Sequence, residues 1–171
     1  MIQIQKATIY DAKILSEVGF NSFKSAHGHS APKKDIEEYM SQNFTENVFF
    51  KELSNEKNQF YLIKYNDDIV GYTLVIFNKK EPQIPVANPA YLSRIYLLEA
   101  YYGLGLGKQL FDFIKSLCIE NKQSGIWLNV WVENQRAISF YKKQGFEIVG
   151  KSDYQISTTH SNPNHVMFLQ L

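Results

Sequence analysis

The stretch EAYYGLGLGKQL, residues 99–110, places glycines where a helix is expected to begin. Gly103, Gly105 and Gly107 alternate with leucines between an apolar run and an amphipathic run. Each glycine costs a helix about 1 kcal/mol relative to alanine, so this pattern needs a reason. The reason is either a turn with positive φ angles or the close approach of a ligand to bare main chain. In both cases the chain is constrained to a strand, a tight turn and a helix at this point.

A ligand at this junction is expected to be an anion. The first N–H groups of a helix lack internal partners, and the helix dipole adds partial positive charge. Missing Cβ atoms let phosphate oxygens reach those groups. The spacing is not that of a P-loop, because Tyr102 stands at its first glycine and Gln109 at its Ser/Thr. It also fails the Gly-x-Gly-x-x-Gly dinucleotide pattern, although Glu133, at the end of the next strand, keeps that alternative open.

Hydrophobic periodicity divides the rest of the chain into strands and helices. Strands are expected near residues 2–4, as a hairpin across 59–77, and at 90–98, 124–132, 146–156 and 165–171, with a polar loop over 157–164. Helices are expected from Thr8 to about Phe23, around 36–40, within 43–58, and at 106–117 and 134–144. This order predicts an α/β fold, with one mixed, mostly antiparallel central sheet, helices on both faces and a single domain across residues 1–171.

The net charge and the cysteine content exclude some classes of binding partner. A net charge of +1 argues against a partner held by charge alone, such as a long nucleic acid. The one cysteine, Cys118, excludes internal disulfides and is expected to be a small buried thiol. His27 and His29 are expected to face solvent, with pocket lining or metal binding as alternatives. Because these histidines are expected to face solvent, we expect no metal. No segment resembles a signal peptide or is long enough to span a bilayer, so we expect a cytoplasmic protein with no membrane partner.

Two motifs resemble signatures of the GCN5-related N-acetyltransferase (GNAT) superfamily. Its phosphate-loop pattern, Gln/Arg-x-x-Gly-x-Gly/Ala, maps onto residues 102–107, where Gly105 and Gly107 match and Tyr102 departs. Its second signature, Asn-x-x-Ala-x-x-x-Tyr, is met in full by Asn134, Ala137 and Tyr141. The stretches KELSN, RIY, GLGK and IWL-VW are most similar to the bacterial PaiA-type polyamine acetyltransferases. The resemblance covers most of the chain.

The resemblance implies acetyl-CoA as donor, with its pantetheine arm in a splay between parallel strands at residues 93–98 and 126–132. The pantetheine amides would pair with the main chain of residues 95–97 like an added strand, and the diphosphate would lie on the amides of the glycine bend. Lys143 is preferred over Arg136 and Lys142 for the adenosine-side phosphate, against the alternative of a solvated helix face. The implied cofactor-binding residues are Ile95, Tyr96, Leu97, Gly103, Leu104, Gly105, Leu106, Gly107, Lys108, Asn134, Ala137, Tyr141 and Lys143.

The catalytic residues implied are Leu97, whose N–H would stabilise the tetrahedral oxyanion, and Tyr141, which would protonate the departing thiolate. The base is open. Ser93 stands where many relatives carry a glutamate, so Glu133, Asp153 or a chain of waters are the candidates.

The leading hypothesis for the activity is acetyl transfer to a small primary amine such as a polyamine. Loss of the acid at position 93 weakens the polyamine assignment, because a cationic substrate favours carboxylates in its pocket. A protein or peptide amine is the second hypothesis, and a non-catalytic CoA-binding regulatory module is the third. Trp127, Asn129 and Trp131 share one face of their strand, which is expected to pack under helices, with Trp131 at the acceptor cleft as an alternative. The sequence does not indicate an oligomeric state.

Overall fold

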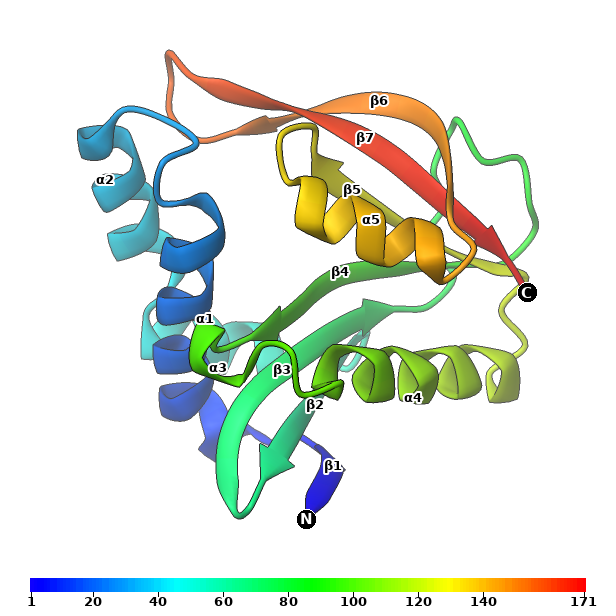
Figure 1. The fold of residues 1–171 in the computed structure, drawn as a ribbon, viewed down its shortest axis with the longest axis horizontal. Coiled ribbons are helices and arrows are strands. Elements are labelled where there is room, and N and C mark those ends of the chain that lie inside the picture. The colour runs from blue at the N-terminus through cyan, green and yellow to red at the C-terminus, as the bar shows by residue number, and fades with distance from the viewer.

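The sheet of this protein has seven strands in the order β1-β2-β3-β4-β5-β7-β6, as seen in a computed structural model that describes residues 1–171 (Figure 1). The strands are β1 (Ile2–Lys6), β2 (Asn58–Tyr65), β3 (Asp68–Ile76), β4 (Pro89–Leu97), β5 (Gly125–Trp131), β6 (Glu147–Gln155) and β7 (Ser161–Gln170). The helices are α1 (Ala12–His27), α2 (Lys33–Asn43), α3 (Glu46–Leu53), α4 (Leu106–Glu120) and α5 (Gln135–Lys143), with short 3₁₀ turns η1 (Ile9–Asp11) and η2 (Glu99–Tyr101). The predicted α/β fold and the order of its strands and α-helices are confirmed.

Two apolar clusters cover the two faces of the sheet. Successive side chains of a strand point to opposite faces, so Leu62 of β2 belongs to the cluster under α1 and α3, whereas Ile63 belongs to the cluster under α4 and α5. Both side chains are fully buried. Central strands that carry apolar residues at both odd and even positions therefore need helices on both faces of the sheet, as Figure 1 shows.

The parallel pair β4 and β5 holds together at one end only. The ladder joins Pro89, Ala90 and Tyr91 to Gly125, Ile126 and Trp127, and the strands separate beyond it (Figure 1). On its other edge β4 stays paired with β3 as far as Leu97. The splay expected between these strands is thus present, and it leaves one edge of β4 without a neighbouring strand.

Two local features differ from the sequence-based prediction. Strand β7 begins at Ser161, so the loop expected over residues 157–164 is wrong for its second half. Pro163 favoured the loop, but its carbonyl accepts a hydrogen bond from the Val132 N–H at 3.1 Å, just past the end of β5. In an antiparallel strand the N–H and C=O of a residue point to the same side, so the missing N–H of Pro163 costs no bond to β6. The turn η2 was not predicted.

Helix α4 carries the single cysteine. Cys118 is fully buried in the cluster under α4 and α5, as predicted for a small buried thiol. Burial raises the pKa of its thiol to about 12. None of the helices is long and apolar enough to cross a bilayer.

Candidate active site

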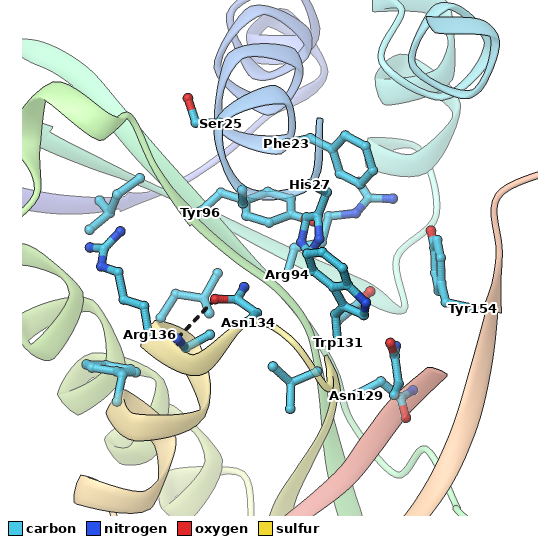
Figure 2. Close-up of a pocket in the computed structure, with 18 of the residues that line it drawn as sticks. Phe23, Ser25, His27, Arg94, Tyr96, Asn129, Trp131, Asn134, Arg136 and Tyr154 are labelled. Atoms are coloured by element: carbon cyan, nitrogen blue, oxygen red, sulfur yellow. Dashed lines mark hydrogen bonds between the residues drawn. The ribbon is translucent and has the colours of Figure 1, made fainter. Parts of the chain in front are cut away.

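A cavity of about 740 Å³ lies where β4 and β5 separate (Figure 2). Its walls come from β4 and β5, from α1 and α2, from the turn before α4, from α5 and from the β6–β7 hairpin. Most of the predicted site residues line it, namely Ile95, Tyr96, Leu97, Gly103, Gly107, Asn134, Ala137 and Tyr141. The other predicted residues, which do not line it, are Leu104, Gly105, Leu106, Lys108 and Lys143.

The glycine bend forms the start of α4 and leaves its first N–H groups free. Gly103 and Gly105 have φ angles of +80° and +75°, which glycine adopts without strain. Gly105 is the N-cap residue, and no side chain caps the helix. The first N–H groups of α4 therefore have no side-chain acceptor, and an anion can take that place.

Gly107 has no conformational reason to be glycine. Its φ is not positive, and an added Cβ would lie 3.6 Å from Leu97 and 3.8 Å from Phe140, which are ordinary contact distances. An alanine would therefore fit the fold at this position. A bare main chain is required only if something else comes close to it, and this is the position that the phosphate-loop motif assigns to the diphosphate.

The free edge of β4 carries a main-chain donor toward the cavity. The Leu98 N–H donates to the Val70 carbonyl at 2.8 Å, on the side of β3. Alternate N–H groups along a strand point to opposite sides, so the Leu97 N–H points toward β5, into the gap between the strands. This is the direction that an oxyanion donor requires.

Helix α5 brings Asn134 and Tyr141 to the cavity. The Asn134 Oδ1 accepts a hydrogen bond from the Ala137 N–H at 3.2 Å and so caps the helix (Figure 2). Tyr141 packs against Phe140 and Phe146, and burial raises the pKa of its phenol well above its usual value. A phenol in this environment remains protonated at neutral pH and can act as a proton donor.

Three cationic side chains on α4 and α5 differ in their partners. The Lys108 ammonium pairs with Asp112 at 2.5 Å along α4, and Lys143 is exposed outside the cavity. Arg136 instead stacks its guanidinium 3.3 Å from the ring centroid of Tyr102, and both side chains line the cavity beside Gly103. The preference for Lys143 at the adenosine-side phosphate stays a prediction, and Arg136 lies over Tyr102, the position at which the motif has Gln or Arg.

The opposite end of the cavity is rich in aromatic side chains. Trp131 faces it beside the ring of His27 (Figure 2). The Trp131 ring also contacts the ring of His29. The expectation that His27 faces solvent is wrong, because α1 extends to this residue and places its ring in the cavity wall. Burial, and secondarily the charge of His29, lowers the pKa of His27 to about 4, so its imidazole is neutral at pH 7.

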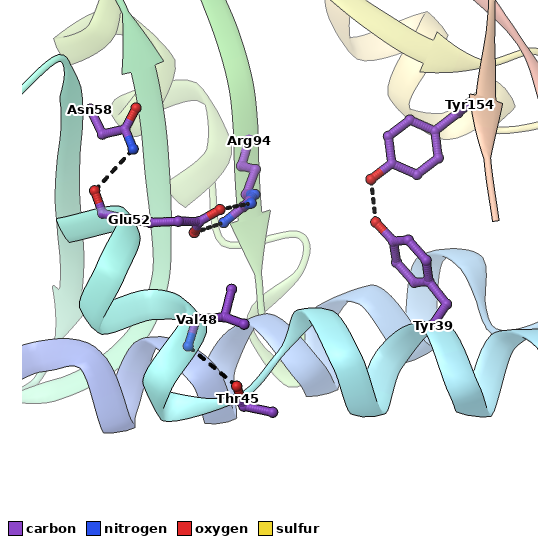
Figure 3. A network of polar contacts seen from close by, with 7 residues as sticks. All are labelled: Tyr39, Thr45, Val48, Glu52, Asn58, Arg94 and Tyr154. Atoms are coloured by element: carbon purple, nitrogen blue, oxygen red, sulfur yellow. Dashed lines mark hydrogen bonds and ion pairs between the residues drawn. The ribbon is translucent and has the colours of Figure 1, made fainter. Parts of the chain in front are cut away.

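One ion pair supports this end of the cavity. Arg94 of β4 makes a bidentate contact with Glu52 of α3, at 2.8 and 2.7 Å (Figure 3). Asn58 donates to the Glu52 carbonyl at 2.9 Å and fixes the end of the helix (Figure 3). Neither candidate base, Glu133 or Asp153, lines the cavity, whereas Ser93, the residue that stands in place of the expected glutamate, does. No group of three His, Cys, Asp or Glu side chains is placed to hold a metal ion.

Contacts between α1–α2 and the β6–β7 hairpin bridge the aromatic end of the cavity. The hydroxyl groups of Tyr39 and Tyr154 are hydrogen-bonded to each other across the gap (Figure 3). Asn162 of β7 donates to the Ser30 hydroxyl, in the loop between α1 and α2, at 2.8 Å. These contacts join segments more than a hundred residues apart and make a roof over this end of the cavity.

The splayed pair of parallel strands beside an uncapped helix start is the arrangement that the GNAT resemblance implies for binding coenzyme A. A model of the acetyltransferase (GNAT) family matches residues 21–146, and the chain belongs to this family. An uncharacterized N-acetyltransferase from the pepI 3′ region of Lactobacillus delbrueckii subsp. lactis is 25% identical over 144 residues, which cover 84% of this chain and 83% of that protein. An uncharacterized N-acetyltransferase of Mycobacterium tuberculosis is 27% identical over 161 residues, which cover 94% of this chain and 98% of that protein.

The fold is also similar to solved structures. The crystal structure of the PaiA N-acetyltransferase from Thermoplasma acidophilum in complex with coenzyme A matches with a TM-score of 0.79 and 23% identity, covering 100% of this chain and 99% of that one. The ribosomal-protein-S18-alanine N-acetyltransferase from Escherichia coli matches with a TM-score of 0.69 and 18% identity, covering 99% and 94%. Membership of the acetyltransferase (GNAT) family makes the protein an N-acetyltransferase that uses acetyl-CoA as co-substrate.

Proposed function

We propose that residues 1–171 act as one N-acetyltransferase domain whose acceptor is a small primary amine. The observation that carries this proposal is the roof over the aromatic end, made by the Tyr39–Tyr154 and Asn162–Ser30 contacts. A protein substrate needs an open groove, whereas a roofed cavity admits a short amine. A polyamine belongs to this class, and the fold likeness to a PaiA enzyme supports it.

Each step of the transfer has a residue assigned to it. The neutral amine attacks the thioester carbonyl, the C–N bond forms, and the Leu97 N–H donates to the oxyanion. The C–S bond then breaks, and the thiolate takes the phenolic proton of Tyr141. Because Ser93 provides no carboxylate, the amine proton passes to water, and the phenolate regains a proton from solvent.

The phosphates of the donor are assigned to two groups. The free N–H groups from Leu106 to Lys108 hold the diphosphate, supported by the absence of a cap on α4. Arg136 supplies the guanidinium that the phosphate-loop motif places at position 102, because it has no acidic partner and lies on the Tyr102 ring. The Lys108 side chain is paired with Asp112, and the Lys143 side chain lies outside the cavity.

The direct test is release of free coenzyme A from acetyl-CoA in the presence of amines. We expect spermidine, 2-phenylethylamine or another small amine to raise the rate of thiol release above the rate with water alone. A lysine peptide that exceeds every small amine would favour a protein acceptor. Coenzyme A binding by calorimetry without any acceptor-dependent turnover would favour a non-catalytic binding module and contradict the proposal.

A further inference from the structure

Resting on the proposed function, we infer that the acceptor is a monoamine with an aromatic or apolar body, and that its amino group donates a hydrogen bond to the side chain of Asn164. The acceptor end of the cavity carries three features that determine which amine it can hold: its charge, its aromatic walls and one buried oxygen without a partner.

The charge of the cavity does not suit a polycation. Glu99 is the one carboxylate among the residues that line the cavity, and it is exposed on η2, directly before the glycine bend. Glu52 lies outside the lining and is engaged by Arg94 through both oxygens. A second or third ammonium group in this space would be desolvated beside a guanidinium and without a counter-charge, which is costly.

The walls suit a flat apolar group. Phe23 packs against His27 and Tyr39, with ring centroids 5.0 and 5.2 Å apart, and His27 contacts Trp131. Figure 2 shows Phe23, His27, Trp131 and Tyr154 around the same end of the cavity. The neutral His27 adds no charge at pH 7. Aromatic walls of this kind bind rings by stacking, and they attract a single cation through their faces.

Among the buried side-chain atoms without a hydrogen-bond partner, the Asn164 Oδ1 is the one that belongs to a residue lining the cavity. Its side chain is 7% exposed and lines the cavity, and its Oδ1 accepts no hydrogen bond. In register it lies between Trp131 of β5 and Ser152 of β6, so all three side chains share one face. A buried carbonyl oxygen without a donor is rare and has a cost, because it loses its hydrogen bonds to water and gains none in the protein. An N–H of the acceptor amine removes that cost, and there is one such oxygen for one amino group.

The first test compares matched amines with the wild-type protein. Thiol release is measured with 2-phenylethylamine, butylamine, 1,4-diaminobutane and spermidine at a fixed acetyl-CoA concentration. We expect kcat/KM for 2-phenylethylamine to exceed that for spermidine and 1,4-diaminobutane at least tenfold. Equal or better use of spermidine would overturn the inference while leaving the proposed function intact. Silence with every amine, including a lysine peptide, would overturn both.

The second test changes the oxygen itself. Asn164→Leu keeps the size of the side chain and breaks no hydrogen bond within the protein, because the Asn164 side chain makes none. We expect it to raise KM for 2-phenylethylamine about tenfold and to leave the coenzyme A affinity unchanged, which also shows that the variant is folded. Ser22→Ala is the control, since it removes an equally buried and unpartnered oxygen outside the cavity, and KM should not change. An unchanged KM in Asn164→Leu would contradict the role of Asn164.

Discussion

Four residues of α5 line the cavity, and two of them carry the chemistry assigned to this helix. Arg136 lies near the helix start, over Tyr102 and beside the glycine bend, so it serves the phosphate end of the donor. Tyr141 lies more than a turn later among aromatic side chains, where its phenol remains protonated. Each role rests on a single functional group and can be tested by removing it.

Removal of the Tyr141 hydroxyl tests the proton donor. We expect Tyr141→Phe to lower kcat about 100-fold, the usual scale for a positioned acid, while the affinity for coenzyme A stays within a factor of two or so. The measurement is steady-state thiol release together with calorimetry. A kcat equal to that of the wild type would remove Tyr141 from the mechanism.

Exchange of the phosphate-binding cation tests Arg136. A charge-assisted hydrogen bond is worth about 1.5–3 kcal/mol, so Arg136→Ala should weaken coenzyme A binding about tenfold or more. The double variant Arg136→Ala with Tyr102→Arg returns a guanidinium to the position that the motif assigns, and we expect it to recover most of the loss. Lys143→Ala is the matched control and should bind normally. If the control loses affinity and Arg136→Ala does not, the two assignments are reversed.

At the scale of elements, the start of α4 shows how a helix can be built for a ligand at its own expense. The bend has two residues with positive φ angles, no side-chain cap, and a glycine at position 107 that the fold does not need. A helix with these features is less stable than one with a capped, alanine-rich start. In exchange for this lower helix stability, the free N–H groups can bind an anion.

Gly107→Ala separates binding from stability. Because the added methyl group fits and alanine favours the helix by about 1 kcal/mol, the free energy of unfolding should stay the same or rise. Coenzyme A affinity should fall at least tenfold, because the methyl group occupies the space of the diphosphate. Gly105→Ala is the comparison variant, and it should lose stability because its φ is +75°. Tight coenzyme A binding by Gly107→Ala would show that nothing approaches this backbone.

The elements were predictable where the signal was local. The hairpin turn at Asn66 and Asp67, which adopt positive φ angles of 51° and 73°, follows from residue types that tolerate this conformation. The start of β7 was missed because Pro163 indicates a loop unless its neighbours are known. The acceptor end was predicted only in part, with Trp131 at the cleft as an alternative, because Phe23, Trp131 and Asn164 lie far apart in the sequence and only the folded chain brings them to one cavity.

At the scale of the whole molecule, the roof joins the α1–α2 region to the β6–β7 hairpin. Segments around Ser30 and Tyr39 contact the hairpin near Tyr154 and Asn162, and β1 and β6 lie at opposite edges of the sheet. The acceptor end therefore forms only when the whole chain is folded. A buried titratable group in its wall then contributes to the free energy of unfolding of the whole protein.

The low pKa of His27 gives the folded protein a pH dependence. In the unfolded chain this imidazole takes up a proton as the pH falls below about 6.5, whereas in the folded protein it stays neutral to about pH 4. The unfolded state thus binds more protons in this window, so the free energy of unfolding should fall as the pH drops from 6.5 to 4, by as much as about 3 kcal/mol. Above pH 6.5 this contribution is constant.

Urea unfolding followed by tryptophan fluorescence measures this effect. His27→Gln cannot take up the proton, so its stability should fall less than that of the wild type between pH 6.5 and 4. Carboxylates titrate in both proteins and cancel in the difference. Parallel stability curves for the two proteins would contradict a buried neutral His27.

The burial of Cys118 has a practical consequence for every enzyme assay above. A disulfide reagent such as 5,5′-dithiobis(2-nitrobenzoic acid) reacts with thiolates that it can reach, and the protein offers it none at neutral pH. All colour formed in a native sample then comes from product, so turnover can be read continuously without a correction for the enzyme's own sulfur. The same reagent added in denaturant counts one thiol per chain and gives the enzyme concentration.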